Sequence, residues 1–131
     1  MERKIMVVDD EKDVLSSLKT ILERENYEVL TVDNGIDCLN RVEEGFEGII
    51  LMDLMMPRMD GWETIKEIVE RGYTENVSIL IITGKGTRNS QNMSVLGTYI
   101  HDYQTKPLDI KQLVESIERC YQDFEKKKTF A

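Results

Sequence analysis

Three short apolar runs constrain the fold of this chain most strongly. They are Ile5–Val8, Ile49–Met52 and Ile79–Ile82. Because each run is unbroken by polar residues, the three runs predict strands that are covered on both faces, as in a parallel sheet. Two further segments, Tyr27–Val32 and Tyr99–Gln104, mix polar residues into a strand pattern. These two segments predict strands at the edges of the same sheet.

Helical periodicity fills the intervals between these strands. Apolar residues recur at spacings of three and four positions, which places them on one face of a helix. Four such stripes lie at 14–22, 36–42, 62–69 and 110–124. Asp109 is a candidate N-cap for the last stripe, and a helix in the polar stretch Gly84–Gly97 is expected from alternation alone. The alternation predicts a doubly wound α/β fold with right-handed crossovers.

Length and charge narrow the classes of protein to which the chain can belong. Its 131 residues predict one domain at 1–125, followed by a charged C-terminal tail or the start of a linker at 126–131. The net charge of −8 argues against direct contact with nucleic acid, which needs a basic surface. No apolar run approaches the ~20 residues that span a bilayer, and a signal peptide is not expected. We therefore expect a soluble cytoplasmic protein without membrane contact.

The cysteines and the histidine do not form a metal-binding pattern. Cys38 and Cys120 lie far apart without a CxxC spacing, and His101 is the single histidine. A zinc site needs a cluster of such ligands, so none is expected. We expect both cysteines to be reduced, half-buried helix residues, and His101 to be a half-exposed strand residue.

Five polar residues lie where the predicted strands end. Asp9 and Asp10 follow the first strand, Asp53 follows the second apolar run, Thr83 follows the third, and Lys106 follows the last strand. Open α/β sheets bind their ligands in the crevice at the carboxyl ends of the strands. The five side chains are therefore expected to meet at one site.

The chemistry of this set favours a metal ion and a phosphoryl group. Three carboxylates in one crevice repel one another, and a hard cation with oxygen ligands, such as Mg²⁺, relieves that repulsion. Lys106 adds a positive charge, and Thr83 adds a hydroxyl donor for phosphoryl oxygens. Asp53 could itself attack phosphorus, because carboxylates act as nucleophiles in phosphoaspartate chemistry.

Several other phosphate-binding functions lack their motifs here. The chain contains no GxxxxGK[ST] loop and no GxGxxG after the first strand. A metal-dependent phosphohydrolase would need a second acid two residues after Asp53, where the chain has Met55. A flavin-binding module would need a loop rich in Ser and Thr after the first strand, where the chain has Asp9 and Asp10. Both remain weaker alternatives.

Four segments together closely resemble one family. They are Val7–Glu11, Met52–Gly61, Ile82–Gly84 and Tyr103–Pro107. In order and spacing they resemble the receiver domains of response regulators in two-component signalling, of the chemotaxis-regulator type, over about residues 4–122. The resemblance implies a flavodoxin-like fold, with a five-stranded parallel sheet in the order 2-1-3-4-5 and five flanking helices.

The resemblance also implies a phosphorylation reaction. Asp53 would be the phosphoacceptor and would take its phosphoryl group from a sensor histidine kinase or a phosphotransfer protein. Mg²⁺ would be the cofactor, held by Asp10 and Asp53 and by the backbone carbonyl of Met55, with Asp9 assisting. The protein would catalyse only its own phosphorylation and dephosphorylation, and so would not be an enzyme that turns over outside substrates.

A switch is implied by three further positions. Lys106 would contact the phosphoryl oxygens, Thr83 would move toward them, and Tyr103 would turn from an outward to an inward position. Met55 and Lys85 occupy the two variable positions beside the path of the attacking water, and we hypothesise that their long side chains slow hydrolysis of the acyl phosphate.

The sequence does not identify the partner that receives the signal from the switch. The resemblance implies a partner-binding face around the fourth helix, the fifth strand and the fifth helix. That face would contact a downstream target protein, an attached output domain or a second copy of the chain. The segment Leu96–Asp102 replaces the small-residue pattern common in the family, so the face is expected to be unusual. A phosphorylation-independent interaction domain remains an alternative.

Overall fold

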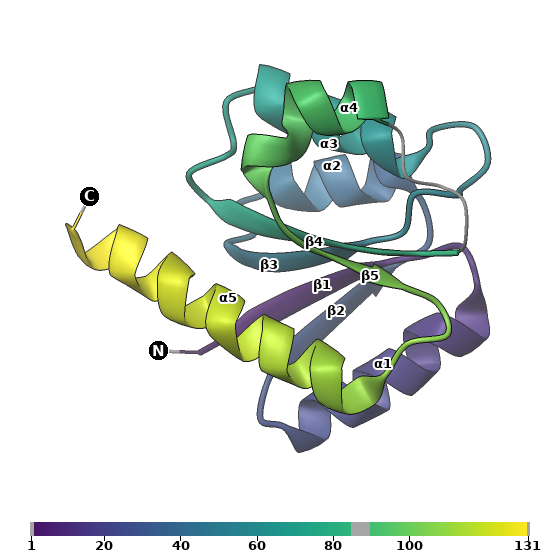
Figure 1. The fold of residues 1–131 in the computed structure, drawn as a ribbon, viewed down its shortest axis with the longest axis vertical. Helices are drawn as coiled ribbons and strands as arrows, with labels where there is room; N and C mark the ends of the chain where they lie inside the picture. Colours follow the sequence, from purple (N-terminus) through teal and green to yellow (C-terminus); the bar gives the residue numbers. More distant parts are fainter. Residues whose placement is uncertain (1, 85–89, 131) are drawn as a thin grey trace.

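The computed structural model describes residues 2–84 and 90–130, and it contains one five-stranded parallel sheet (Figure 1). The strand order is β2-β1-β3-β4-β5, as expected. The strands are β1 (Lys4–Val8), β2 (Glu28–Val32), β3 (Gly48–Met52), β4 (Val77–Thr83) and β5 (Ile100–Thr105). The helices are α1 (Lys12–Arg24), α2 (Gly35–Glu43), α3 (Gly61–Glu70), α4 (Ser90–Leu96), the short 3₁₀ helix η1 (Gly97–Tyr99) and α5 (Ile110–Phe130).

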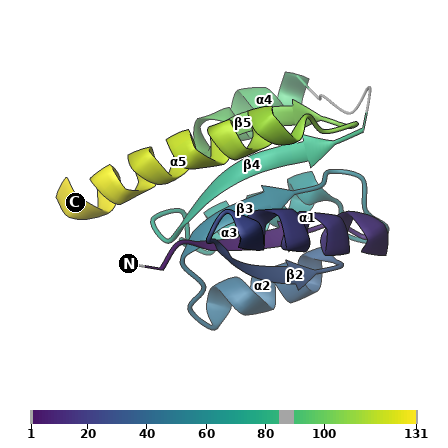
Figure 2. The same cartoon turned by 90° about the horizontal axis from the view of Figure 1, so that it is seen from below.

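The helices form a layer on each face of the sheet. Figure 1 shows α2, α3 and α4 above the sheet and α1 and α5 below it, and Figure 2 shows α1 and α5 from their own side. One apolar core joins the sheet to α2, α3 and α4, and a second joins it to α1 and α5. Because β3 lies at the centre and all five of its residues are buried, the unbroken apolar runs are explained by coverage on both faces.

The two expected edge strands begin one residue later than the sequence pattern suggests. Tyr27 precedes β2, and Tyr99 belongs to η1 rather than to β5. The predicted cap of the last helix is confirmed, because the backbone N–H of Gln112 donates a hydrogen bond to the Asp109 carboxylate at 3.1 Å. No helix among residues 2–84 and 90–130 has the length and apolar content needed to cross a bilayer.

A β-bulge interrupts the pairing of β4 with β5. Ile79 pairs with Ile100, but Leu80 pairs with Asp102, so His101 is an extra residue in β5. Side chains alternate along a regular strand, and the extra residue reverses that alternation. As a result Tyr103 shares a face with Ile81 and packs against the core beneath α4, while Asp102 faces α5.

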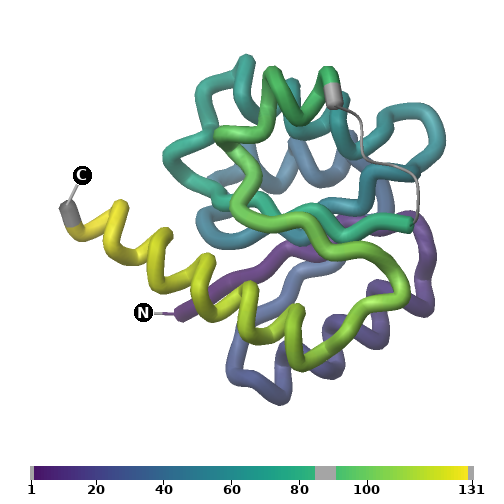
Figure 3. Tube along the Cα trace, in the orientation of Figure 1, coloured from purple at the N-terminus to yellow at the C-terminus, as the bar shows by residue number. Residues whose placement is uncertain are grey.

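Helix α5 continues to Phe130, so most of the predicted tail or linker start at 126–131 is helical. Figure 3 shows the N-terminus beside this helix. Arg3 pairs there with Glu118 and with Glu125, each at 2.7 Å, and its guanidinium lies over the ring of Tyr121. These contacts between distant parts of the chain hold the C-terminal half of α5 against the sheet.

The cysteines are more deeply buried than expected. Cys38 and Cys120 both have 0% exposure and both carry free thiols. Burial raises the pKa of the Cys38 thiol to about 12 and that of Cys120 to about 11. Each cysteine lies on the core-facing side of its helix, where the sheet covers it, so both act as small apolar residues.

Candidate functional site

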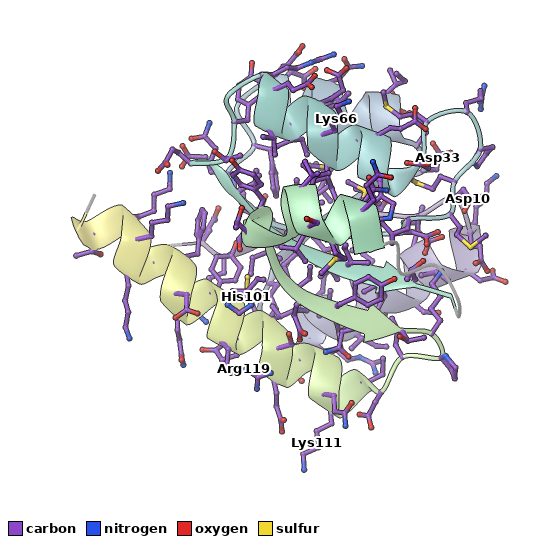
Figure 4. The ribbon with its side chains drawn as sticks, turned by 45° about the horizontal axis from the view of Figure 1, so that its top comes forward. Asp10, Asp33, Lys66, His101, Lys111 and Arg119 are labelled. Atoms are coloured by element: carbon purple, nitrogen blue, oxygen red, sulfur yellow. The ribbon has the colours of Figure 1, made fainter. Side chains whose placement is uncertain are left out.

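The strand register brings three aspartates together at the carboxyl edge of the sheet. Val8 of β1 pairs with Met52 of β3, so the residues that follow these two strands, Asp9 and Asp53, are neighbours. Asp10 comes next in the chain, and Figure 4 shows it on the opposite side of the molecule from the C-terminal end of α5. One carboxylate oxygen from each aspartate lies within 4.8 Å of the others.

The three carboxylates differ in their contact with solvent. Asp9 has 0% exposure and Asp53 has 2%, whereas Asp10 is exposed. Burial and the negative charge of Asp9 raise the pKa of Asp53 to about 6, and the nearby ammonium of Lys106 offsets only part of that rise. Two buried carboxylates and one exposed carboxylate at this spacing fit a hard divalent cation with oxygen ligands.

Lys106 reaches this cluster from the loop after β5. Its Nζ lies 2.8 Å from Asp9 Oδ2, 3.3 Å from Glu11 Oε1 and 3.9 Å from Asp53 Oδ2. Burial acts to lower the pKa of Lys106, but its bond to Asp9 and the charge of Asp53 raise it overall. The peptide bond between Lys106 and Pro107 is cis. The lysine is therefore a fixed cation beside the acidic cluster.

Glu11 was missed by the sequence reasoning, although it belongs to this cluster. Its contact with Lys106 gives the ammonium a partner at the solvent side, opposite buried Asp9. Its place directly after two aspartates was the available signal. An acidic residue at the N-terminal end of a helix is common, however, so that signal did not single Glu11 out.

The other predicted site residues are Thr83, Tyr103, Met55 and Lys85, and the structure describes the first three. Thr83 is the last residue of β4 and is fully buried, and Tyr103 is half-buried beneath α4. Met55 is 62% exposed, and its backbone N–H donates to Asp53 Oδ1 at 3.3 Å. Lys85 lies outside the residues that the structure describes. The structure thus brings Thr83 to the same edge of the sheet as the aspartates and places Met55 next to Asp53.

The backbone after Asp53 is held by the start of α3. A Cβ atom at Gly61 would lie 2.4 Å from the carbonyl oxygen of Asp53, so a larger residue cannot occupy this position without movement. The N–H of Gly61 donates to the carbonyl of Leu54 at 3.0 Å. Asp60 and Glu63 form a capping box that starts the helix. The glycine was noted in the sequence only as part of a motif, without this role.

A polar network joins β5 to α5 behind Tyr103. Asp102 accepts hydrogen bonds from the hydroxyl of Ser116, from Gln104 at 2.9 Å and from the N–H of Tyr103 at 2.8 Å. Burial alone would raise the pKa of Asp102, but these donors outweigh burial and lower it. His101 lies 2.9 Å from Asp123 of α5. The sequence did not predict this network, because its members are distant along the chain.

Comparison with known proteins gives matches that extend over most of the chain. The family model described as "Response regulator receiver domain" matches residues 5–118. The chain is 33% identical over 116 residues to a "Transcriptional regulatory protein CpxR homolog" of Haemophilus influenzae. It is also 33% identical over 115 residues to the "Alkaline phosphatase synthesis transcriptional regulatory protein PhoP" of Bacillus subtilis. These matches cover 87% and 86% of this chain but 48% and 46% of the two relatives. The chain therefore spans about half the length of the curated relatives it matches.

Solved structures agree with the architecture. A CheY-like receiver domain protein from Methanospirillum hungatei superimposes with a TM-score of 0.89 at 32% identity, covering 96% of this chain and 99% of that one. The chemotaxis response regulator CheY4 of Vibrio cholerae superimposes with a TM-score of 0.80 at 23% identity, covering 92% of this chain and 99% of that one, which supports the fold alone.

Proposed function

Because this chain belongs to the family of response regulator receiver domains, we propose that phosphorylation of Asp53 sets its signalling state. Receiver domains of two-component response regulators are signalling domains rather than classical enzymes. The observation that supports this proposal best is the environment of Asp53. Its carboxylate is 2% exposed, and it lies among two further carboxylates and the ammonium of Lys106 at the carboxyl edge of the sheet.

The reaction we propose is a transfer of one phosphoryl group. A carboxylate oxygen of Asp53 forms a bond to phosphorus, and the bond between phosphorus and the donor nitrogen of a phosphohistidine breaks, which returns the imidazole. Lys106 stabilises the negative charge on the phosphoryl oxygens, and the Thr83 hydroxyl can donate a hydrogen bond to them. The donor would be a sensor histidine kinase or a phosphotransfer protein, and small phosphodonors would also serve.

Mg²⁺ is the cofactor that the donor set fits best. Asp10, Asp53 and the backbone carbonyl of Met55 would hold it, with Asp9 assisting, and the ion would neutralise charge on the phosphoryl oxygens. Asp9 is already paired with Lys106 at 2.8 Å, which supports an assisting role rather than the main one. Three carboxylates so close together favour such an ion, since each disfavours ionisation of the others.

We further propose that the state of Asp53 is read at the surface formed by α4, β5 and α5. Tyr103 supports this, because the bulge at His101 places it beneath α4 while Asp102 is tied to α5. The partner would be a downstream target protein, an attached output domain or a second copy of the chain. We assign residues 1–125 to the receiver domain and 126–131 to a tail or linker start, and we propose a cytoplasmic location.

Intact-protein mass after incubation with acetyl phosphate tests this proposal. We expect one phosphoryl adduct that requires Mg²⁺, is abolished by a chelator and is absent from Asp53→Asn. The same adduct in Asp53→Asn would overturn the assignment of the phosphoacceptor. A folded, metal-replete protein that takes no phosphoryl group, even from a histidine kinase, would instead indicate a phosphorylation-independent interaction domain.

A further inference from the structure

Met55 is the most exposed methionine among the residues that the structure describes. Its exposure is 62%, whereas Met6 and Met52 are fully buried and Met56 is 7% exposed. A thioether that solvent reaches can be oxidised to the sulfoxide, while a buried one is shielded. The chain therefore presents one methionine to a dissolved oxidant far more openly than these others.

The position of Met55 connects this exposure to the phosphoacceptor. Its backbone N–H donates a hydrogen bond to Asp53 Oδ1 at 3.3 Å, and the Cβ of Met55 is two covalent bonds from that nitrogen. Its neighbours Leu54 and Met56 are both buried, so the loop is held on either side while the Met55 side chain extends into solvent. A chemical change at Met55 therefore takes place beside Asp53 without opening the core.

We propose that Met55 is a peroxide-sensitive modification site, and that its oxidation shortens the lifetime of the phosphoryl group on Asp53. In this step one peroxide oxygen forms a bond to the Met55 sulfur and the O–O bond breaks. The other peroxide oxygen leaves as water with both peroxide protons. The sulfur is oxidised by two electrons and the peroxide is reduced, and reduction of the sulfoxide by a thiol-dependent reductase would restore the thioether.

The expected direction follows from the polarity of the product. The thioether is a weak acceptor, so it does little to hold a water molecule near Asp53. The sulfoxide oxygen is a strong acceptor, and it would hold water beside the acyl phosphate that water must attack. Oxidation would thereby replace an apolar barrier with a polar group that recruits the nucleophile. This inference rests on the proposed function, since it concerns the same phosphorylated aspartate.

Peptide mass mapping tests the first half of the inference. The full chain is treated with hydrogen peroxide, and oxygen incorporation is followed at each methionine over time. We expect Met55 to gain oxygen severalfold faster than the half-buried Met59 and Met93. Equal rates at the three residues would overturn the assignment, and this readout does not depend on phosphorylation.

Phosphoaspartate half-life tests the second half. Each protein is phosphorylated with acetyl phosphate and Mg²⁺ before or after peroxide treatment, and loss of the adduct is followed by intact mass. We expect the oxidised protein to lose phosphate severalfold faster, Met93→Leu to respond in the same way, and Met55→Leu to show the same half-life with and without peroxide. Met55→Gln, which carries a polar acceptor of similar length, should lose phosphate faster than Met55→Leu without any oxidant.

The two measurements distinguish a failure of this inference from a failure of the proposed function. Oxidation of Met55 with an unchanged half-life would overturn the inference and leave the proposed function standing. Absence of any phosphoryl adduct on untreated protein would overturn the proposed function and the inference with it.

Discussion

The ammonium group of Lys106 lies closer to Asp9 than to Asp53, at 2.8 Å against 3.9 Å. In this state the lysine therefore compensates the fully buried charge of Asp9, and Asp53 receives only a weaker interaction. A phosphoryl group on Asp53 would bring new negative charge within reach of the same ammonium. The two distances indicate that Lys106 stabilises the unphosphorylated protein through Asp9, in addition to any role in phosphorylation.

Lys106→Met is expected to destabilise the metal-free protein. The substitution leaves the carboxylate of Asp9 buried without its cation. Because Lys106 is itself 20% exposed, we expect a loss of about 1–3 kcal/mol, less than for a fully buried pair. Urea unfolding in a chelator measures the loss, and added Mg²⁺ should recover part of it. Lys66→Met, which removes an exposed ion pair, is the matched control and should change stability little. Equal losses in the two variants would contradict the expectation.

Asp53→Asn is expected to stabilise the metal-free protein at neutral pH. The folded-state pKa of Asp53 is raised to about 6, so the folded protein binds a proton more readily than the unfolded chain does. The contribution of Asp53 to the stability of the metal-free protein should therefore fall as pH rises from about 4 to about 6 and then level off. Removing the charge should abolish this fall and add on the order of 2–3 kcal/mol at pH 7. Unfolding curves across pH measure it, with exposed Glu75→Gln as the control. A parallel pH dependence of the two variants would be the contrary result.

Gly61→Ala should disturb the backbone that carries Asp53. A Cβ atom there would meet the Asp53 carbonyl oxygen at 2.4 Å, and backbone cannot give way as a flexible side chain can. We expect a loss of about 1–3 kcal/mol together with slower phosphorylation by acetyl phosphate. Gly97→Ala is the control, because its Cβ would make an ordinary contact with Met93 at 3.9 Å. Normal phosphorylation of a folded Gly61→Ala protein would show that the close approach is dispensable.

Arg3→Met should loosen the C-terminal half of α5. The guanidinium pairs with Glu118 and Glu125 and lies over the ring of Tyr121, and all of these contacts would be lost. Hydrogen exchange is the direct measurement, and we expect faster exchange in residues 118–130 with little change at the carboxyl edge of the sheet. Arg24→Met, at an exposed position on α1, should leave exchange in α5 unchanged. Faster exchange throughout the protein would indicate general destabilisation instead.

The strands and the aspartates could be predicted from the sequence for the same physical reason. Each is encoded locally, because a buried parallel strand is an apolar run and its ligand-binding residue comes directly after it. Asp9, Asp10 and Asp53 were found in this way. The sheet order was predicted only through the resemblance to a known family, since parallel strands far apart in the chain leave no local trace of their neighbours.

The contacts that were missed join residues far apart in the chain. Asp102 and Ser116 lie on different elements, and the sequence around each residue does not indicate that the two are in contact. The charged run at the end of α5 predicted either a tail or the start of a linker and did not decide between them. In the structure Lys127 lies near Glu75 and Lys128 near Glu47, at 3.9 Å and 3.8 Å. A run of charge therefore predicts solvent exposure but does not determine whether the segment is helical.

The bulge at His101 also relates the length of this segment to the direction of Tyr103. Ile100 and Tyr103 lie three residues apart and yet face the same core, which a strand without an extra residue does not allow. Removing the extra residue would leave Ile100 and Tyr103 two positions apart, and a regular strand keeps residues two positions apart on the same face. A relative with a gap of one residue here could therefore direct its tyrosine toward the same core without a bulge, whereas a strand of the present length without the bulge would turn Tyr103 toward α5.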